Sequence, residues 1–308
     1  MSVVNHARIA LHFHPDRLLV NRIPVAKNLL QTGRYKNQYE TNISADSVSA
    51  FSGGSRDNWE NEIFKGAYKN SASSERPKYG SLNLTLTQDG PSPRFGSCFF
   101  LLRPEVKTRG AFSYGDSHQS PREFGPIRHM ESIHAALLND LFTRGAALGE
   151  KDTNVFEFLT LSNSLLPHSS DFSKYRKPSE NLDFYIEAQV HGDISLYGDV
   201  EQLIADYLFY ETKAGSELEL LCEKYDIKLN WNAGLELRVE DFPMNFRGVK
   251  IPEVAGKFSE KGVLNAFLIG EASKNMNDDY ESLQMLKYLW HCIVKFGREI
   301  KEPGIFRQ

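Results

Sequence analysis

The stretch that constrains the fold most is DFYIEAQVHGDI, residues 183–194, because apolar and polar side chains alternate along it. Successive side chains of a β-strand point to opposite faces, so the pattern predicts a strand. Its core face would carry Phe184, Ile186, Ala188 and Val190, and its other face Tyr185, Glu187, Gln189 and His191. A polar second face fits an exposed edge strand, but an acid, an amide and an imidazole in a row also fit a ligand-binding face.

Composition narrows the class of protein. The chain has 308 residues, a formal charge of −4 and an apolar fraction of 41%, enough for one large core or two modest ones. Its Lys and Arg residues are scattered, which predicts no nucleic-acid partner. No apolar run approaches the ~20 residues of a membrane span. The N-terminus lacks the pattern of a signal peptide, and the three cysteines favour free thiols. We therefore expect a soluble protein of cytosolic type with no membrane partner.

The remaining patterns predict a mixed α+β core. Strands are expected at residues 7–13, 79–87 and 94–104, the last apolar on both faces and therefore central, and helices at 23–33, 130–142 and 199–209. Asp199 would cap the last of these helices. The polar stretch 37–80 is predicted to be a binding loop, held in place by Trp59, Phe64 and Tyr68.

From about residue 213 the pattern becomes mainly helical. Residues 216–225 and 278–297 carry long amphipathic repeats. Because an apolar helix stripe must be covered, we expect residues 213–308 to form a helical subdomain packed on an α+β domain of residues 1–212.

Two histidines end the first predicted strand. In LHFHPDR, residues 11–17, alternation places His12 and His14 on the same side. Such a pair can begin the site of a metal-dependent phosphoesterase, which also needs clustered carboxylates and further histidines. It can also be structural, or it can hydrogen-bond a ligand. The other histidines stand singly, so the pattern favours ligand binding without a metal.

Glu187 is the strongest candidate for chemistry. The sequence contains neither a Gly-rich phosphate loop nor a nucleophile elbow, and Ser97 and Ser117 have no His and Asp at a recognisable spacing. An acid in the middle of a strand with an apolar back face needs a group that orients it. Tyr185 and Gln189 flank Glu187 on its own face, and together the three can hold a sugar by hydrogen bonds.

A series of sequence blocks resembles a known bacterial family. The blocks are HFHPDR, YKNQYET, GGSRDNWE, FKGAY, RPKYGSLNL, RFGSCFFLL, GDS and YIEAQVHGDI, within about residues 7–206, with LKYLWHCIVKFG near the end. They resemble a family described as a domain of unknown function, whose members include a Legionella effector type similar to mono-ADP-ribosyltransferases. RPKYGSLN and EAQVHG together are the most specific part of the resemblance.

The resemblance implies an ADP-ribosyltransferase-like fold and transfer of ADP-ribose from NAD to an arginine of a target protein. In such enzymes a strand-borne glutamate binds the ribose 2′-hydroxyl and stabilises an oxocarbenium-like transition state. Glu187 would take this role, with Gln189 and Tyr185 beside it in the catalytic site. Arginine-modifying enzymes usually carry Glu or Gln two positions before the glutamate, where this chain has Tyr185. The effector members modify NAD-dependent glutamate dehydrogenase of a host, so a translocated effector with that target is the expectation.

The resemblance also implies the residues that bind NAD, which is a substrate here, with no metal. The first-strand residue would be His12, His14 or Arg17, and the middle-strand residue would be Tyr79 or Ser97. Arg17 and Arg76 would bind the pyrophosphate. Tyr68 and Tyr79 would stack on a base, and Asn83 would bind a ribose or an amide. Surface ion pairs are the alternative for the arginines, and core packing is the alternative for the tyrosines. Arg56, Trp59 and Glu60 would line the polar loop.

Two other functions remain open. A metal-dependent phosphoesterase built on His12 and His14 would lose activity with a chelator and would be indifferent to NAD. A catalytically inactive NAD-binding module would bind NAD without releasing nicotinamide.

Overall fold

A central β-sheet organises the computed structural model, which describes residues 2–41, 50–165, 170–276 and 279–300. Its eight strands run in the order β10-β9-β4-β1-β3-β7-β5-β6. The strands are β1 (Arg8–Phe13), β3 (Lys78–Asn83), β4 (Cys98–Leu102), β5 (Gly110–Tyr114), β6 (Phe124–Pro126), β7 (Ile186–Val190), β9 (Val200–Asp206) and β10 (Lys228–Asn232). Neighbours are antiparallel except β10 and β9, which are parallel, so the sheet is mixed. The predicted α+β class is confirmed.

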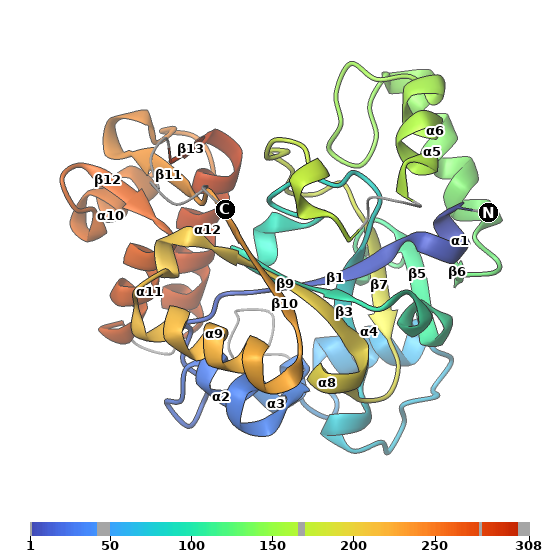
Figure 1. Cartoon of the computed structure of the whole chain (residues 1–308), viewed down its shortest axis with the longest axis horizontal. Helices are drawn as coiled ribbons and strands as arrows, with labels where there is room; N and C mark the ends of the chain where they lie inside the picture. Colours follow the sequence, from blue (N-terminus) through green and yellow to red (C-terminus); the bar gives the residue numbers. More distant parts are fainter. Residues whose placement is uncertain (1, 42–49, 166–169, 277–278, 301–308) are drawn as a thin grey trace.

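Helices surround this sheet, and two small sheets complete the fold (Figure 1). The helices are α1 (Ser2–His6), α2 (Val25–Thr32), α3 (Gln38–Thr41), α4 (Ser55–Ile63), α5 (Glu131–Arg144), α6 (Val155–Asn163), α8 (Leu196–Asp199), α9 (Lys213–Tyr225), α10 (Ile251–Phe258), α11 (Ala266–Lys274) and α12 (Tyr280–Phe296). β2 (Arg34–Tyr35) pairs with β8 (Ile194–Ser195), and β11 (Leu235–Arg238) lies between β12 (Val263–Asn265) and β13 (Arg298–Glu299). Among the described helices, none is both long and apolar enough to cross a membrane.

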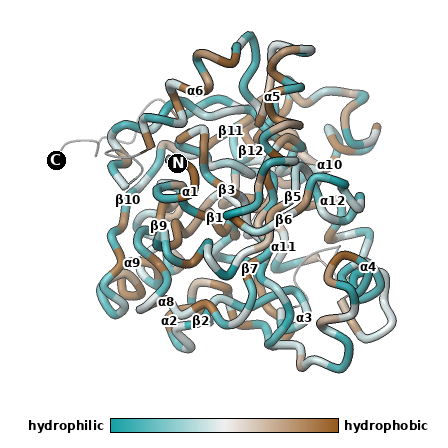
Figure 2. The backbone as a smooth tube through the Cα atoms, turned by 90° about the vertical axis from the view of Figure 1, so that its right-hand side faces the viewer, coloured by the Kyte–Doolittle hydropathy of each residue, from teal (hydrophilic) through white to brown (hydrophobic). Residues whose placement is uncertain are grey.

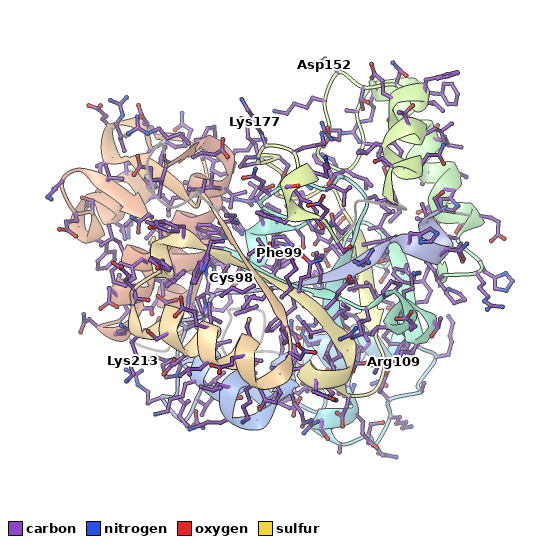
Figure 3. All side chains as sticks on the ribbon, in the orientation of Figure 1. Cys98, Phe99, Arg109, Asp152, Lys177 and Lys213 are labelled. Carbon is purple, nitrogen blue, oxygen red and sulfur yellow. The ribbon has the colours of Figure 1, made fainter. Side chains whose placement is uncertain are left out.

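β4 is central, as its sequence predicts. It pairs with β1 on one side and β9 on the other. Cys98, Phe99 and Phe100 are all fully buried, and Figure 3 labels the first two near the middle of the molecule. Each buried Phe contributes about 1.5–3 kcal/mol relative to exposure, so a strand apolar on both faces is stable only between two neighbours.

The predicted helix at residues 23–33 is α2, and its end has two physical causes. Gly33 adopts a left-handed conformation with φ 64°, and its N–H donates to the carbonyl of Leu29. A Cβ at Gly33 would also lie 2.9 Å from the Tyr225 hydroxyl of α9. Glycine is therefore required both to end α2 and to let α9 pack against it. Figure 2 shows hydrophilic and hydrophobic residues mixed along α9, as expected for a helix with one face in the core.

The helix predicted at residues 199–209 is wrong. Residues Val200–Asp206 form β9, and Tyr207–Phe209 form a short 3-10 helix. Asp199 is the last residue of α8 rather than a cap. Because β9 is buried on both faces between β4 and β10, its apolar residues do not alternate and mimic a helical repeat.

Two further expectations are corrected. The polar stretch 37–80 contains α3 and α4 in its described part, rather than one irregular loop; residues 42–49 lie outside the described residues. Phe184 is 48% exposed and precedes β7, which begins at Ile186, so it does not belong to the core face. The guanidinium of Arg144 lies over its ring, 5.0 Å from the centroid.

Residues after 212 share the core of the residues before them. β10 extends the main sheet, and α9 packs on α2. One hydrophobic cluster includes side chains from both parts, such as Leu101 and Leu289. The indole N–H of Trp290 on α12 donates to the carbonyl of Pro93 at 2.8 Å. The division expected at residue 212 therefore separates two parts that are packed as one unit.

Candidate active site

A large cavity lies beside the C-terminal end of β1, where the main sheet meets α2, α4 and α12. Its volume of about 1050 Å³ is at the upper end of the range for small-molecule sites. Its lining includes Gly80 of β3, Glu187 of β7 and Trp290 of α12. The cavity is thus built from both halves of the chain.

Cationic side chains dominate the polar lining of this cavity. Among the described residues it is lined by seven cationic side chains, Arg17, Arg34, Lys36, Arg56, Arg94, Arg247 and Lys287, and by three carboxylates, Asp116, Asp183 and Glu187. The whole chain, in contrast, has a formal charge of −4. Concentrating positive charge in a concave site of an acidic protein favours an anionic ligand.

Glu187 projects into this cavity from a strand that is not at an edge. β7 pairs with β3 on one side and β5 on the other, which places Ser81 and Ser113 opposite Glu187. The side chain is only 6% exposed. The exposed-edge interpretation of the polar face is therefore wrong, because the acid faces a cavity rather than bulk solvent.

Gln189 holds the carboxylate of Glu187. Its Nε2 donates to Glu187 Oε1 at 2.7 Å and to Ser113 Oγ at 3.2 Å. These two hydrogen bonds fix the orientation of the amide. Burial, and after it the nearby Asp116 carboxylate, raise the pKa of Glu187 to about 7, while the Ser117 hydroxyl, Gln189 and Arg56 act in the opposite direction. Near neutral pH this carboxylate is poised between its two protonation states.

Tyr185 is buried and positions a second carboxylate. Its hydroxyl donates to Asp116 Oδ2 at 3.3 Å, and its ring packs against Phe95 with centroids 5.7 Å apart. Asp116 also accepts the backbone N–H of His118 at 3.0 Å and lines the cavity. The sequence alone did not single out Asp116 as a site residue, although Asp116 belongs to the GDS block of the resemblance. Tyr185 itself does not line the cavity.

His12 and His14 both line the cavity, and each is held as a neutral ring. His12 Nδ1 lies 3.0 Å from the carbonyl of Gly96, which fixes the proton on that nitrogen, and Nε2 accepts the Ser92 N–H at 3.4 Å. Burial lowers the pKa of His12 to about 4. His14 contacts Trp290 edge-on at 5.1 Å, and burial lowers its pKa well below the ordinary value. Within the described ranges, no three His, Cys, Asp or Glu side chains gather as a possible metal site.

Three neighbouring strands contribute the predicted residues in the expected order. β1, β3 and β7 are adjacent in the sheet, and His12, Tyr79 and Glu187 on them all line the cavity. Arg17, just after β1, lines it too, and burial lowers the pKa of its guanidinium. The structure therefore brings these predicted residues together with Glu187.

Arg76 and Tyr68 lie behind the cavity wall. Arg76 is buried and pairs with Asp57 at 2.6 Å and with Glu60 at 3.2 Å. Tyr68 hydrogen-bonds the ring of His191 and is not among the lining residues. The charge of Arg76 is thus neutralised inside the protein, and the geometry gives no support for a direct contact with a ligand.

Asn83 and Ser97 lie away from the cavity that holds Glu187. Asn83 is buried at the far end of β3, where its Nδ2 donates to the Tyr175 hydroxyl at 3.2 Å. Ser97 lines a separate small cavity of about 20 Å³ that also contains Asp206. The structure does not bring either residue to the candidate active site.

The family model described as Protein of unknown function (DUF3626) matches residues 8–296. The chain belongs to this family. The matched region of the DUF3626 chain runs from the start of β1 to the end of α12, so the whole lining of the cavity falls within it. No curated protein matches the chain.

Proposed function

We propose that this DUF3626 protein is a mono-ADP-ribosyltransferase that transfers ADP-ribose from NAD to an arginine side chain of a target protein. The observation that carries the proposal is Glu187, a buried carboxylate on a central strand, facing a large cavity rich in cationic groups. NAD combines a pyrophosphate, which suits the cationic lining, with a sugar whose reaction needs one well-placed carboxylate.

In the proposed reaction, the bond between the nicotinamide nitrogen and ribose C1′ breaks, and its electron pair leaves with nicotinamide. Glu187 binds the 2′-hydroxyl and stabilises the positive charge that develops on the ribose, as carboxylates do in glycoside hydrolysis. A guanidinium nitrogen of the acceptor then bonds to C1′ and gives up a proton, for which Glu187 is the acceptor. Gln189 keeps the carboxylate aimed by its 2.7 Å hydrogen bond.

The position two before Glu187 holds Tyr185 rather than an acid, and the cavity supplies a second carboxylate by another route. The Tyr185 hydroxyl donates to Asp116, which lines the cavity and raises the pKa of Glu187. This arrangement supports an acceptor that carries a positive charge. The resemblance to effector enzymes makes NAD-dependent glutamate dehydrogenase of a host cell the proposed target, with the protein translocated into that cell.

The fold supports the same activity. His12, Tyr79 and Glu187 stand on three adjacent strands, as a first-strand imidazole, a middle-strand aromatic hydroxyl and a late-strand glutamate do in ADP-ribosyltransferase-like folds. We propose that the mixed sheet is of that type, and that the part after residue 212 shapes the acceptor side, because Arg247 and Trp290 line the cavity from there.

The test is incubation of the purified protein with NAD labelled in its adenylate, a host-cell lysate and purified glutamate dehydrogenase. The proposal expects label on a protein band, resistance to a metal chelator, and loss of the band with Glu187→Gln. Label released as free ADP-ribose with no labelled band would indicate an NAD hydrolase. NAD binding without nicotinamide release would indicate an inactive binding module. Chelator-sensitive hydrolysis of phosphate esters would indicate the phosphoesterase instead.

A further inference from the structure

The cavity wall at the start of α4 presents hydrogen-bond donors that lack acceptors. Arg56 is only 7% exposed and lines the cavity. Its Nε and Nη1 have no hydrogen-bond partner in the described part of the chain. Glu60 Oε1 lies 3.9 Å from Nη1, an ion-pair contact that is beyond hydrogen-bonding distance. The buried indole Nε1 of Trp59, which also lines the cavity, has no partner either.

Aromatic rings hold the Arg56 guanidinium in place. It lies over the ring of Trp59 at 4.5 Å and over the ring of Tyr79 at 5.0 Å. These contacts are attractive through the ring quadrupoles, and they supply no hydrogen-bond acceptor to Nε or Nη1 of the guanidinium.

Glu60 compensates the charge of Arg56 only in part, because the same carboxylate also pairs with Arg76 and accepts two other hydrogen bonds. Glu60 is fully buried and accepts from the Tyr79 hydroxyl at 2.8 Å and from the Tyr39 hydroxyl at 3.1 Å, besides pairing with Arg76. Buried guanidinium N–H groups without a hydrogen-bond acceptor are unfavourable, even with an acid 3.9 Å away. The retention of Arg56 in a cavity indicates that an acceptor arrives with the ligand.

The N-terminus of α4 also favours an anionic ligand. α4 begins at Ser55, and its N-cap residue Gly54 makes no side-chain hydrogen bond to the first turn. The first N–H groups of a helix have no partner within it and carry a partial positive charge. Ser55 and Arg56 at this end both line the cavity.

We propose that Arg56, the Trp59 indole N–H and the first turn of α4 form a phosphate-binding site. All three offer donors and no acceptor, which selects an oxyanion, and the planar guanidinium matches a phosphate bidentately. That the phosphate belongs to the pyrophosphate of NAD rests on the proposed function. Under that function Arg56, rather than Arg76, takes the pyrophosphate. Its position also suits the reaction, since Arg56 lies close enough to lower the pKa of Glu187.

Calorimetric titration of the full chain with ADP, pyrophosphate, NAD and phosphate-free nicotinamide riboside tests the site. Arg56→Gln should weaken binding of ADP, pyrophosphate and NAD by about tenfold or more, and Arg56→Lys by less, because the charge stays but the fork is lost. Binding of nicotinamide riboside should stay within about twofold. Arg109→Gln is the control, because Arg109 pairs with Asp199 at 2.7 Å and does not line the cavity.

Thermal unfolding separates this role from a structural one. Arg56→Gln removes a buried charge whose Nε and Nη1 lack a hydrogen-bond acceptor, so its melting temperature should be equal to or above that of the wild type, whereas loss of a structural arginine would lower it. Equal affinity of wild type and Arg56→Gln for ADP and pyrophosphate, or no binding of either by the wild type at millimolar concentration, would overturn the proposal. ADP binding that needs Arg56, without nicotinamide release from NAD, would leave the phosphate site standing and refute the transferase. Nicotinamide release from NAD with an unchanged KM for NAD in Arg56→Gln would support the transferase and refute the phosphate site.

Discussion

Gln189 Nε2 donates to Glu187 Oε1 at 2.7 Å from two positions further along the same strand. Both side chains project from one face of β7, and Ser113 holds the amide from the neighbouring strand. The Glu187 carboxylate therefore faces the cavity in one orientation, which the strand and the Gln189 amide determine.

Replacing Gln189 with Leu tests that orientation. The carboxylate would lose its donor, so we expect kcat for nicotinamide release to fall about ten- to hundredfold and the pKa of Glu187 to rise. Steady-state kinetics across pH measure both effects. Gln202→Leu removes a buried glutamine on β9 outside the cavity lining and serves as the control. A matching loss of kcat in both variants would mean that Gln189 acts only on stability.

Asp116→Asn tests the electrostatic link between the two cavity carboxylates. Asp116 raises the pKa of Glu187, so its neutralisation should lower that pKa from about 7. Since the ionised form of Glu187 is the active one, kcat/KM should rise with pH, and its midpoint should move to lower pH in the variant. The amide oxygen can still accept from His118. Asp183→Asn, at another carboxylate of the cavity lining, is the control, and an unmoved midpoint in Asp116→Asn would contradict the link.

Arg76→Gln tests whether Arg76 stabilises the wall of the cavity rather than binding the ligand. The change would leave Asp57 without its close ion-pair partner and the fully buried Glu60 with only the 3.9 Å pair to Arg56. Breaking a buried pair in this way costs about 3–5 kcal/mol of unfolding free energy. Urea unfolding measures it, with the exposed pair of Lys151 and Glu180 as control through Lys151→Gln, for which we expect almost no change. Full stability with weakened NAD binding would restore Arg76 as a ligand residue.

Buried carboxylates predict a loss of stability at rising pH. Burial raises the pKa of Asp16 and of Asp206 to about 7 from 3.8. The folded state therefore binds more protons than the unfolded state between these values, so stability is full below about pH 4 and falls as pH rises through about 7. We expect each group to remove roughly 2–3 kcal/mol between pH 5 and pH 8.

Urea unfolding at pH 5 and pH 8 measures this fall, and Asp206→Asn should reduce it. The asparagine oxygen keeps the hydrogen bond that Asp206 Oδ1 accepts from the N–H of Leu208. Asp226→Asn, at the exposed end of α9, is the matched control. A pH dependence identical in wild type and Asp206→Asn would show that Asp206 is not protonated near neutral pH in the folded protein.

The sequence predicts some parts of this molecule well for a physical reason. Alternation with period two identifies β7 and its polar face, because only one of its faces is fully apolar. The same rule fails at β9, whose residues are buried on both faces. Local patterns therefore identify a strand when its environment differs between its faces, and they become ambiguous when the environment is the same.

Local sequence patterns are also ambiguous for the residues of the candidate site. Arg56 and Arg76 are equivalent as residue types, and only tertiary contacts decide that Arg76 pairs closely with Asp57 and Glu60 while Nε and Nη1 of Arg56 have no hydrogen-bond partner. Asp116 lies 69 positions before Tyr185, and only the folded chain brings its carboxylate to the tyrosine hydroxyl. Such assignments follow from packing between distant segments, which no local spacing encodes.

The central claim is that Glu187 stabilises the ribose cation of NAD, and the most direct measurement is the rate of nicotinamide release from NAD. We expect release by the wild type and a loss of about a hundredfold or more in Glu187→Gln, with NAD affinity nearly unchanged, because the amide keeps the shape but loses the charge. Equal release by both proteins, or none by the wild type under conditions where NAD is bound, would contradict the claim.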